Sequence, residues 1–139
     1  MKTREKLFEF MQGYLHGVIS TVDENGAPCS AIVGFGQTRD LEIVIGTTNT
    51  SQKYQNLMAD SRVAFVLGGA TLETIQFQGT ARELRPDELD IVRQNYWTKN
   101  PRVEKYHEDP AERYFLLKPT WIRYSNVGVD PWDITELKF

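Results

Sequence analysis

The spacing of hydrophobic residues predicts a chain of short strands interrupted by three helices. Apolar residues recur every three or four positions over Thr3–Leu15, opposite charged residues, which predicts an amphipathic helix. Shorter patterns predict helices over Ser51–Met58 and Pro86–Asn95. Runs rich in β-branched and aromatic residues predict the strands. The expected strands are Gly17–Val22, Pro28–Phe35, Leu41–Gly46, Arg62–Leu67, Leu72–Leu84, Tyr114–Leu117, Trp121–Ser125 and Ile134–Phe139.

Turn signals between these runs indicate antiparallel pairing. Asn25-Gly26 lies between two strand-like runs and predicts a hairpin. Gly68-Gly69 breaks the chain before the longest strand, and the polar segment Asn100–Pro110 is expected to be a loop, with one helical turn as the alternative. Strands outnumber helices and no regular strand–helix–strand rhythm is present. The pattern therefore predicts one mainly β domain, with a small antiparallel barrel and inserted helices.

Composition narrows the classes of function. The chain has 139 residues and a net charge of -3, so nothing points to nucleic acid as a partner. A lone cysteine, Cys29, cannot form an internal disulfide, which favours a reducing compartment. No apolar run is long enough to cross a membrane, and the first residues lack the apolar core of a signal peptide. We therefore expect a cytoplasmic protein without membrane partners.

The stretch Ile43–Leu57 is the strongest candidate for a functional site. It begins as a β-branched strand, continues through Gly46 and five small polar residues at Thr47–Ser51, and runs into a helix that carries Lys53. A helix start presents free N–H groups and a partial positive charge, so hydroxyls and a lysine placed there suit a phosphate. An ordinary capped helix with a solvated lysine is the alternative. The glycine and lysine spacing of a Walker loop is absent.

Other reactive side chains form no recognisable set. Two histidines far apart, His16 and His107, make a poor metal site together with Cys29, so we predict no metal. No general base is evident near Cys29, and we nominate no catalytic residue. The aromatic residues near the third helix are expected to pack in a core or an interface, with a mobile lid over Asn100–Pro110 as the alternative.

The order of these segments resembles the pyridoxamine 5′-phosphate oxidase-like family of FMN-binding split barrels. The likeness covers about Leu15–Leu137. The segments that carry it are Gly17–Val22, Asn25–Pro28, Gly46–Leu57, Asp60–Val63, Arg123–Ser125 and Glu136–Leu137. The family resemblance implies an antiparallel split β-barrel and a homodimer, with two non-covalent FMN molecules in grooves between the subunits.

The resemblance also implies which residues contact the cofactor. Lys53 and Ser51 would hold the FMN phosphate, with Gln52 beside them. Backbone groups of the second strand would meet the flavin pyrimidine edge, and Trp121 and Arg123 would reach the flavin of the other subunit. The complete set implied is Ala31, Ile32, Val33, Gly46, Thr47, Thr48, Ser51, Gln52, Lys53, Thr74, Ile75, Gln76, Trp121 and Arg123.

The sequence differs from the oxidase itself at two sites that the oxidase uses to bind its substrate and product. Ala31 and Gly36 stand where the oxidase has an arginine and a substrate-binding lysine, and the Arg-x-His segment that grips the product is missing. We therefore expect a flavoprotein that does not oxidise pyridoxamine phosphate.

Two functions follow from the resemblance. The first is an FMN-dependent oxidoreductase acting on an unidentified small molecule. The second is a carrier, sensor or stress-related protein that binds FMN, a deazaflavin or haem without turnover. In either flavin case, we expect Lys53→Ala to weaken FMN binding far more than Lys99→Ala.

Overall fold

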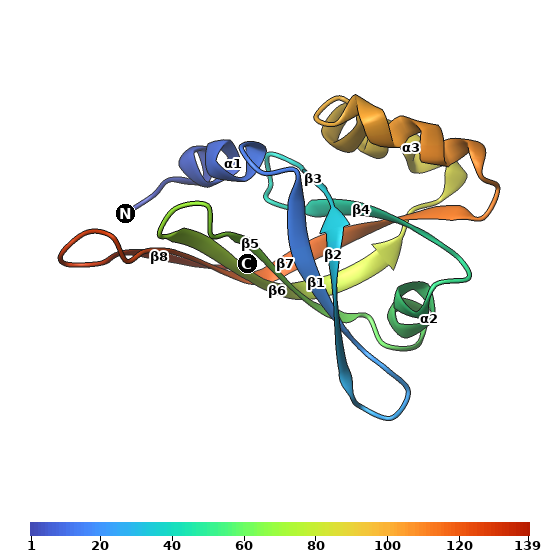
Figure 1. The fold of residues 1–139 in the computed structure, drawn as a ribbon, viewed down its shortest axis with the longest axis horizontal. Coiled ribbons are helices and arrows are strands. Elements are labelled where there is room, and N and C mark those ends of the chain that lie inside the picture. Colours follow the sequence, from blue (N-terminus) through green and yellow to red (C-terminus); the bar gives the residue numbers. More distant parts are fainter.

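The computed structural model describes residues 1–139, and its centre is one antiparallel sheet curled into an open half-barrel (Figure 1). The strands follow the order β2-β1-β5-β6-β7-β4-β3, and β8 pairs with β7. Their bounds are β1 (His16–Val22), β2 (Pro28–Gly34), β3 (Gly36–Gln37), β4 (Ile43–Thr48), β5 (Arg62–Gly68), β6 (Glu73–Glu83), β7 (Glu112–Asn126) and β8 (Asp133–Lys138). The expected mainly β, antiparallel split-barrel fold is confirmed.

The hairpin between β1 and β2 forms as predicted and projects from the body of the molecule (Figure 1). Gly26 has a positive φ of 81°, a conformation that glycine adopts without strain. The Asp23 carboxylate accepts hydrogen bonds from the backbone N–H groups of Asn25, at 2.8 Å, and Ala27, at 2.9 Å. Because β2 pairs only with β1, its outer side is a free edge of the sheet.

The last part of the chain corrects one strand prediction. The two strands expected at Tyr114–Leu117 and Trp121–Ser125 form a single strand, β7. Its first half pairs with β4 and its second half with β8, while β6 runs along the opposite side. Pro119, which lacks an N–H donor, lies between the two halves beside a register shift at Gln78/Gly79. The proline is tolerated there because the ladder is already irregular.

Helices cover the rim of the half-barrel. They are α1 (Arg4–Gln12), α2 (Gln52–Ala59) and a helical segment made of η1 (Pro86–Glu88), α3 (Leu89–Val92) and the π-helical turn η2 (Arg93–Trp97). The segment Asn100–Pro110 was predicted to be a loop with one helical turn as the alternative, and it contains a longer helix, because Pro101–Glu108 forms the 3₁₀ helix η3. Its polar sequence gave no apolar periodicity, since none of its residues is buried. None of the helices is long and apolar enough to cross a lipid bilayer.

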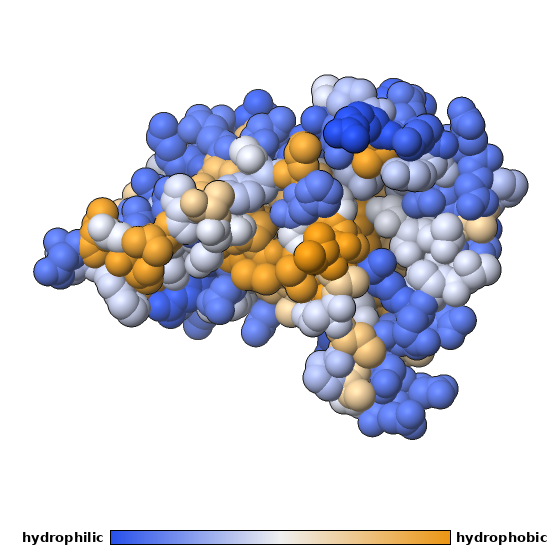
Figure 2. All heavy atoms as spheres, in the orientation of Figure 1, coloured by the Kyte–Doolittle hydropathy of each residue, from blue (hydrophilic) through white to orange (hydrophobic).

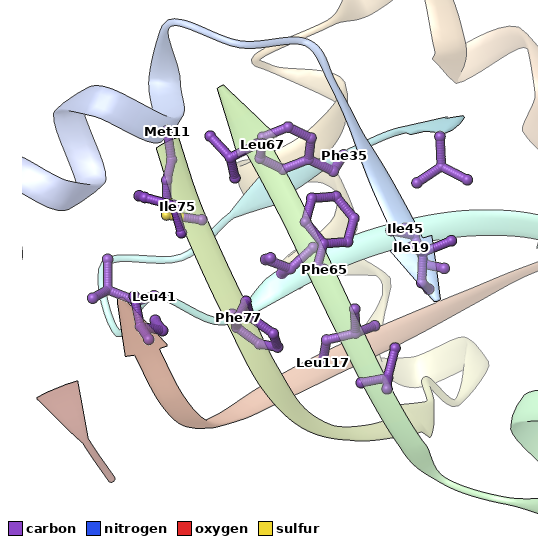
Figure 3. Close-up of a cluster of buried hydrophobic side chains, with 14 of the residues drawn as sticks. Met11, Ile19, Phe35, Leu41, Ile45, Phe65, Leu67, Ile75, Phe77 and Leu117 are labelled. Atoms are coloured by element: carbon purple, nitrogen blue, oxygen red, sulfur yellow. The ribbon is translucent and has the colours of Figure 1, made fainter. Parts of the chain in front are cut away.

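Two hydrophobic clusters hold these layers together. The larger lies inside the curl of the sheet, where α1 contributes the fully buried Leu7 and Met11 (Figure 3). The smaller lies between the helical segment and the opposite face of β4 and β7, around Val44, Tyr96 and Tyr114. Because β4 and β7 are covered on both faces, they fix the position of the polar corner that follows β4.

Candidate functional site

The start of α2 is built as the sequence predicts. Ser51 caps the helix by accepting a hydrogen bond from the Tyr54 N–H at 3.0 Å. Its hydroxyl also lies 2.7 Å from that of Thr47, and its own N–H bonds to the Thr48 carbonyl at 3.1 Å. The first N–H groups of a helix have no partner within it, so those of Gln52 and Lys53 point out of the helix start. The corner therefore offers hydroxyls and backbone donors to an anion.

Lys53 adds a charge that no carboxylate neutralises at close range. Its side chain is half-buried and forms no ion pair within 4.0 Å. Burial lowers the pKa of Lys53, and the more distant Glu112 carboxylate partly offsets that shift. A lysine that is partly desolvated and lacks a close counter-ion gains from a bound anion, which would restore the stability of its charged form.

A small cleft lies beside this lysine, between α2 and the β1–β2 hairpin. Its volume is about 140 Å³, and Ala31, Gln52 and Lys53 are among the residues that line it. Ligand pockets usually measure about 300–1,000 Å³. One copy of the chain therefore encloses space for a phosphate-sized group rather than for a whole nucleotide.

A buried hydrogen-bond chain fixes α2 against the sheet at this cleft. Gln52 donates to the Asn56 side chain at 2.8 Å, and Asn56 donates to the Thr21 hydroxyl at 3.0 Å. Both Asn56 and Thr21 are buried. Neither residue was in the predicted site, although an asparagine four positions after Gln52 on the buried face of a short helix was a detectable signal.

The remaining predicted contact residues lie on two surfaces, the polar corner and the outer face of the sheet. Gly46 and Thr48 belong to the polar corner, where an added Cβ on Gly46 would lie 2.8 Å from the Glu112 carboxylate. Ile32, on the free edge strand, is 77% exposed and shares a cleft of about 260 Å³ with Thr74. Figure 2 shows hydrophobic atoms gathered on this central face of the molecule.

Ile32 lies on the same outer face of the sheet as Gln76 and Arg123, because it is in register with them through Val18 and Val66. Gln76 and Trp121 line a cleft of about 350 Å³ there, and Arg123 forms an ion pair with Glu136 at 3.1 Å. The side chains of Val33 and Ile75 point into the main core, so only their backbones are available to a ligand. A single chain therefore brings together Ala31, Thr47, Ser51, Gln52 and Lys53, and leaves the outer-face residues apart from them.

Comparisons with known proteins agree with this architecture. A family model described as pyridoxamine 5′-phosphate oxidase matches residues 3–126. A search of curated proteins finds no match. The structure of General Stress Protein 26 from Bacillus anthracis is similar over 100% of both chains, with a TM-score of 0.77 and 24% identity.

Two other solved structures show the same fold, and their names mention different ligands. A heme binding protein from Mycobacterium smegmatis matches 99% of this chain with a TM-score of 0.81 and 16% identity, and this chain spans 59% of its length. A pyridoxamine 5′-phosphate oxidase-related, FMN binding protein from Nostoc punctiforme matches 95% of this chain and 90% of its own, with a TM-score of 0.66 and 11% identity.

Proposed function

Because the chain belongs to the pyridoxamine 5′-phosphate oxidase family, we propose that it is an FMN-binding flavoprotein and acts as an oxidoreductase on a small organic substrate. The observation that carries the proposal is the polar corner at the start of α2. There, Lys53 lies half-buried without a close counter-ion, next to free helix N–H groups and the Thr47 and Ser51 hydroxyls. This donor set suits a phosphate monoester.

The residues present fit FMN at its phosphate end. Lys53 and the N–H groups of the first turn of α2 would hold the phosphate, and Thr47 and Thr48 would lie along the sugar-like chain. The free edge of β2 would offer backbone donors and acceptors to the ring. When bound, FMN supplies the redox chemistry, while the protein binds and orients it.

A second copy of the chain would complete the site. The cleft beside Lys53 is too small for the ring system, and the outer-face residues Gln76, Trp121 and Arg123 lie on a different surface. In a homodimer, the outer face of one subunit would cover the edge strand of the other. The 77% exposed Ile32 beside Val66 gives that surface an apolar centre for such a contact.

The substrate differs from pyridoxamine phosphate in this proposal. Gly36 and Ala31 carry no charge where the oxidase has a lysine and an arginine. An added Cβ on Gly36 would lie 2.1 Å from the Asn95 carbonyl oxygen, so the position has no room for a lysine. The backbone of the helical segment packs where that side chain would stand.

A haem-binding protein without turnover is the second candidate. Its support is His16, which lines the same cleft as Ile32 and Thr74, and whose imidazole is a usual haem ligand. The similarity in fold to a heme binding protein also favours it.

A visible absorption spectrum of the purified protein separates the candidates. Flavin bands that persist through gel filtration and bleach on addition of NADPH support the flavoenzyme. Flavin bands without bleaching support a carrier, and a Soret band supports haem. A colourless protein that leaves the fluorescence of added FMN unchanged would exclude the FMN proposal.

A further inference from the structure

A larger cleft lies at the end of the sheet that carries α3, and none of the predicted contact residues lines it. It is formed by the end of β6, the η1–α3 segment, the end of η3 and the start of β7. Its volume is about 340 Å³, within the range of small-molecule pockets. The charges and aromatic groups of its wall indicate what it would bind.

The two arginines of the wall are already engaged. Arg85 pairs with Asp87 at 3.1 Å and lies 3.7 Å from Glu88. Arg113 donates to the carbonyl oxygens of Pro110, at 2.7 Å, and Glu112, at 2.9 Å, and lies 3.9 Å from the Glu83 carboxylate. Each guanidinium therefore already has a carboxylate partner.

Of the three acidic side chains that line the cleft, two are engaged and one is not. Glu83 accepts a hydrogen bond from the Tyr54 hydroxyl at 2.7 Å, and Asp109 accepts one from the Ala111 N–H at 2.9 Å. The Glu112 carboxylate is half-buried, accepts no hydrogen bond and forms no ion pair. Leaving a partly desolvated carboxylate without a donor is unfavourable, so the cleft has one uncompensated negative group.

Aromatic rings stand next to this carboxylate. Tyr114 lies one position beyond Arg113 on β7, and its hydroxyl is 3.3 Å from His107 Nδ1. The ring of His107 packs on Trp97, with centroids 5.1 Å apart, and Trp97 meets Tyr114 edge-on at 5.9 Å. Such rings accommodate the apolar part of a ligand and attract a cation through their faces.

We propose that this cleft binds a protonated amine whose ammonium pairs with Glu112 and whose apolar part packs against His107 and Tyr114. The ligand class is an aryl or alkyl ammonium about as large as a single ring with a short chain. A carboxylate or phosphate ligand is disfavoured, because both arginines of the wall already pair with carboxylates, whereas Glu112 does not.

The surroundings of Glu112 agree with this assignment. The charged and titratable groups near it are Lys53 on α2, Asp109 before β7, Tyr114 on β7 and Tyr96 on η2. Burial raises the pKa of Glu112, Asp109 raises it further, and Lys53 lowers it. Lys53 is the only cation that lowers this pKa, and it forms no ion pair with Glu112, so a bound ammonium would stabilise the carboxylate.

If the proposed function holds, ligand binding at the Lys53 corner and ligand binding at the Glu112 cleft should affect each other. A phosphate at Lys53 would take the one positive charge that faces Glu112. An ammonium in the cleft would compensate for that loss, so FMN and the amine should each tighten the binding of the other.

Binding of benzylamine to the FMN-free protein tests the site independently of the cofactor. We expect saturable binding by calorimetry, with a shift of the Trp97 indole N–H signal in the NMR spectrum, while the signal of Trp132, on the β7–β8 turn, stays in place. Glu112→Gln should weaken binding at least about tenfold, as expected for a charge-assisted hydrogen bond. The matched control is Glu104→Gln, which removes the same charge from exposed η3 outside the cleft.

Three outcomes would overturn the proposal. These are no saturable binding of benzylamine to the unmodified protein, equal binding of the uncharged analogue benzyl alcohol, or equal weakening by Glu112→Gln and Glu104→Gln. Circular dichroism establishes that each variant is folded. Tyr114→Phe, which keeps the ring and removes only the hydroxyl, should retain most of the affinity. Failure of FMN to bind would refute the proposed function and leave the benzylamine result standing.

Discussion

Replacement of Lys53 by alanine is the sharpest test of the phosphate corner. The ammonium is half-buried, has no ion-pair partner within 4.0 Å, and lies beside unpaired N–H groups of the first turn of α2. A hydrogen bond to a charged group contributes about 1.5–3 kcal/mol. We therefore expect Lys53→Ala to raise the dissociation constant for FMN by a factor of about 10 to 100.

The matched control is an exposed lysine. Lys6, on α1, pairs with Glu9 at 3.4 Å and is 63% exposed, and such surface pairs contribute little to stability. Quenching of FMN fluorescence during titration, at fixed ionic strength, gives both dissociation constants. Lys6→Ala should leave the FMN affinity within about twofold of the original, since its charge is solvated.

Riboflavin, which lacks the phosphate, provides the second arm of this test. Its affinity should be the same for the original protein and for Lys53→Ala, because the ring and sugar-like chain contacts are unchanged. An equal loss of FMN and riboflavin affinity would mean that Lys53 supports the fold or the ring, and the assignment of the phosphate site would be refuted.

Three further predictions concern stability. Gly36→Ala should lower the free energy of unfolding by about 2–3 kcal/mol, because its Cβ would lie 2.1 Å from the Asn95 carbonyl oxygen. Gly26→Ala should lower it by about 1–2 kcal/mol, because of its positive φ alone. Urea denaturation compares the two variants, and equal losses of stability would contradict the packing argument. Leu7→Ala should cost about 2–5 kcal/mol, since Leu7 is fully buried in the main core, and an unchanged thermal midpoint would contradict this. Burial lowers the pKa of Lys99 from 10.5 to about 7, so the unfolded chain binds more protons above pH 7 and this group should make stability rise from pH 7 to 9. Denaturation across that range should show a flatter rise in Lys99→Met, and an identical pH dependence in the two proteins would refute the assignment.

The fold was largely predictable because its signals are local. Asn25-Gly26 requires a turn that only such residues adopt easily, and the alternation over β6 places Ile75 and Phe77 in the core. The β7 strand was the exception. Pro119 predicts the end of a strand, because proline has no N–H to donate. Only the pairing of β7 with β6 and β8 shows that the strand continues through this residue.

The site was predictable only in part. The capped helix start with Lys53 follows from neighbouring residues, whereas the proximity of Glu112 to Gly46 depends on the pairing of β4 with β7 across more than sixty positions. The environment of Lys99 could not be predicted from the neighbouring residues in the sequence. Its ammonium bonds to the Gln37 side chain at 2.7 Å and lies 3.6 Å from the Phe35 ring centroid, so Lys99→Ala would perturb packing and is a poor control for FMN binding.

The division of β7 between two neighbours has a consequence for biosynthesis. Its first half meets β4, which the ribosome makes much earlier, but its second half meets β8 at residues 133–138. A nascent chain that has just released β7 therefore carries half of one strand edge bare, together with its exposed amides. That edge can pair with another chain, so a chain that ends before β8 should aggregate more readily than the full chain.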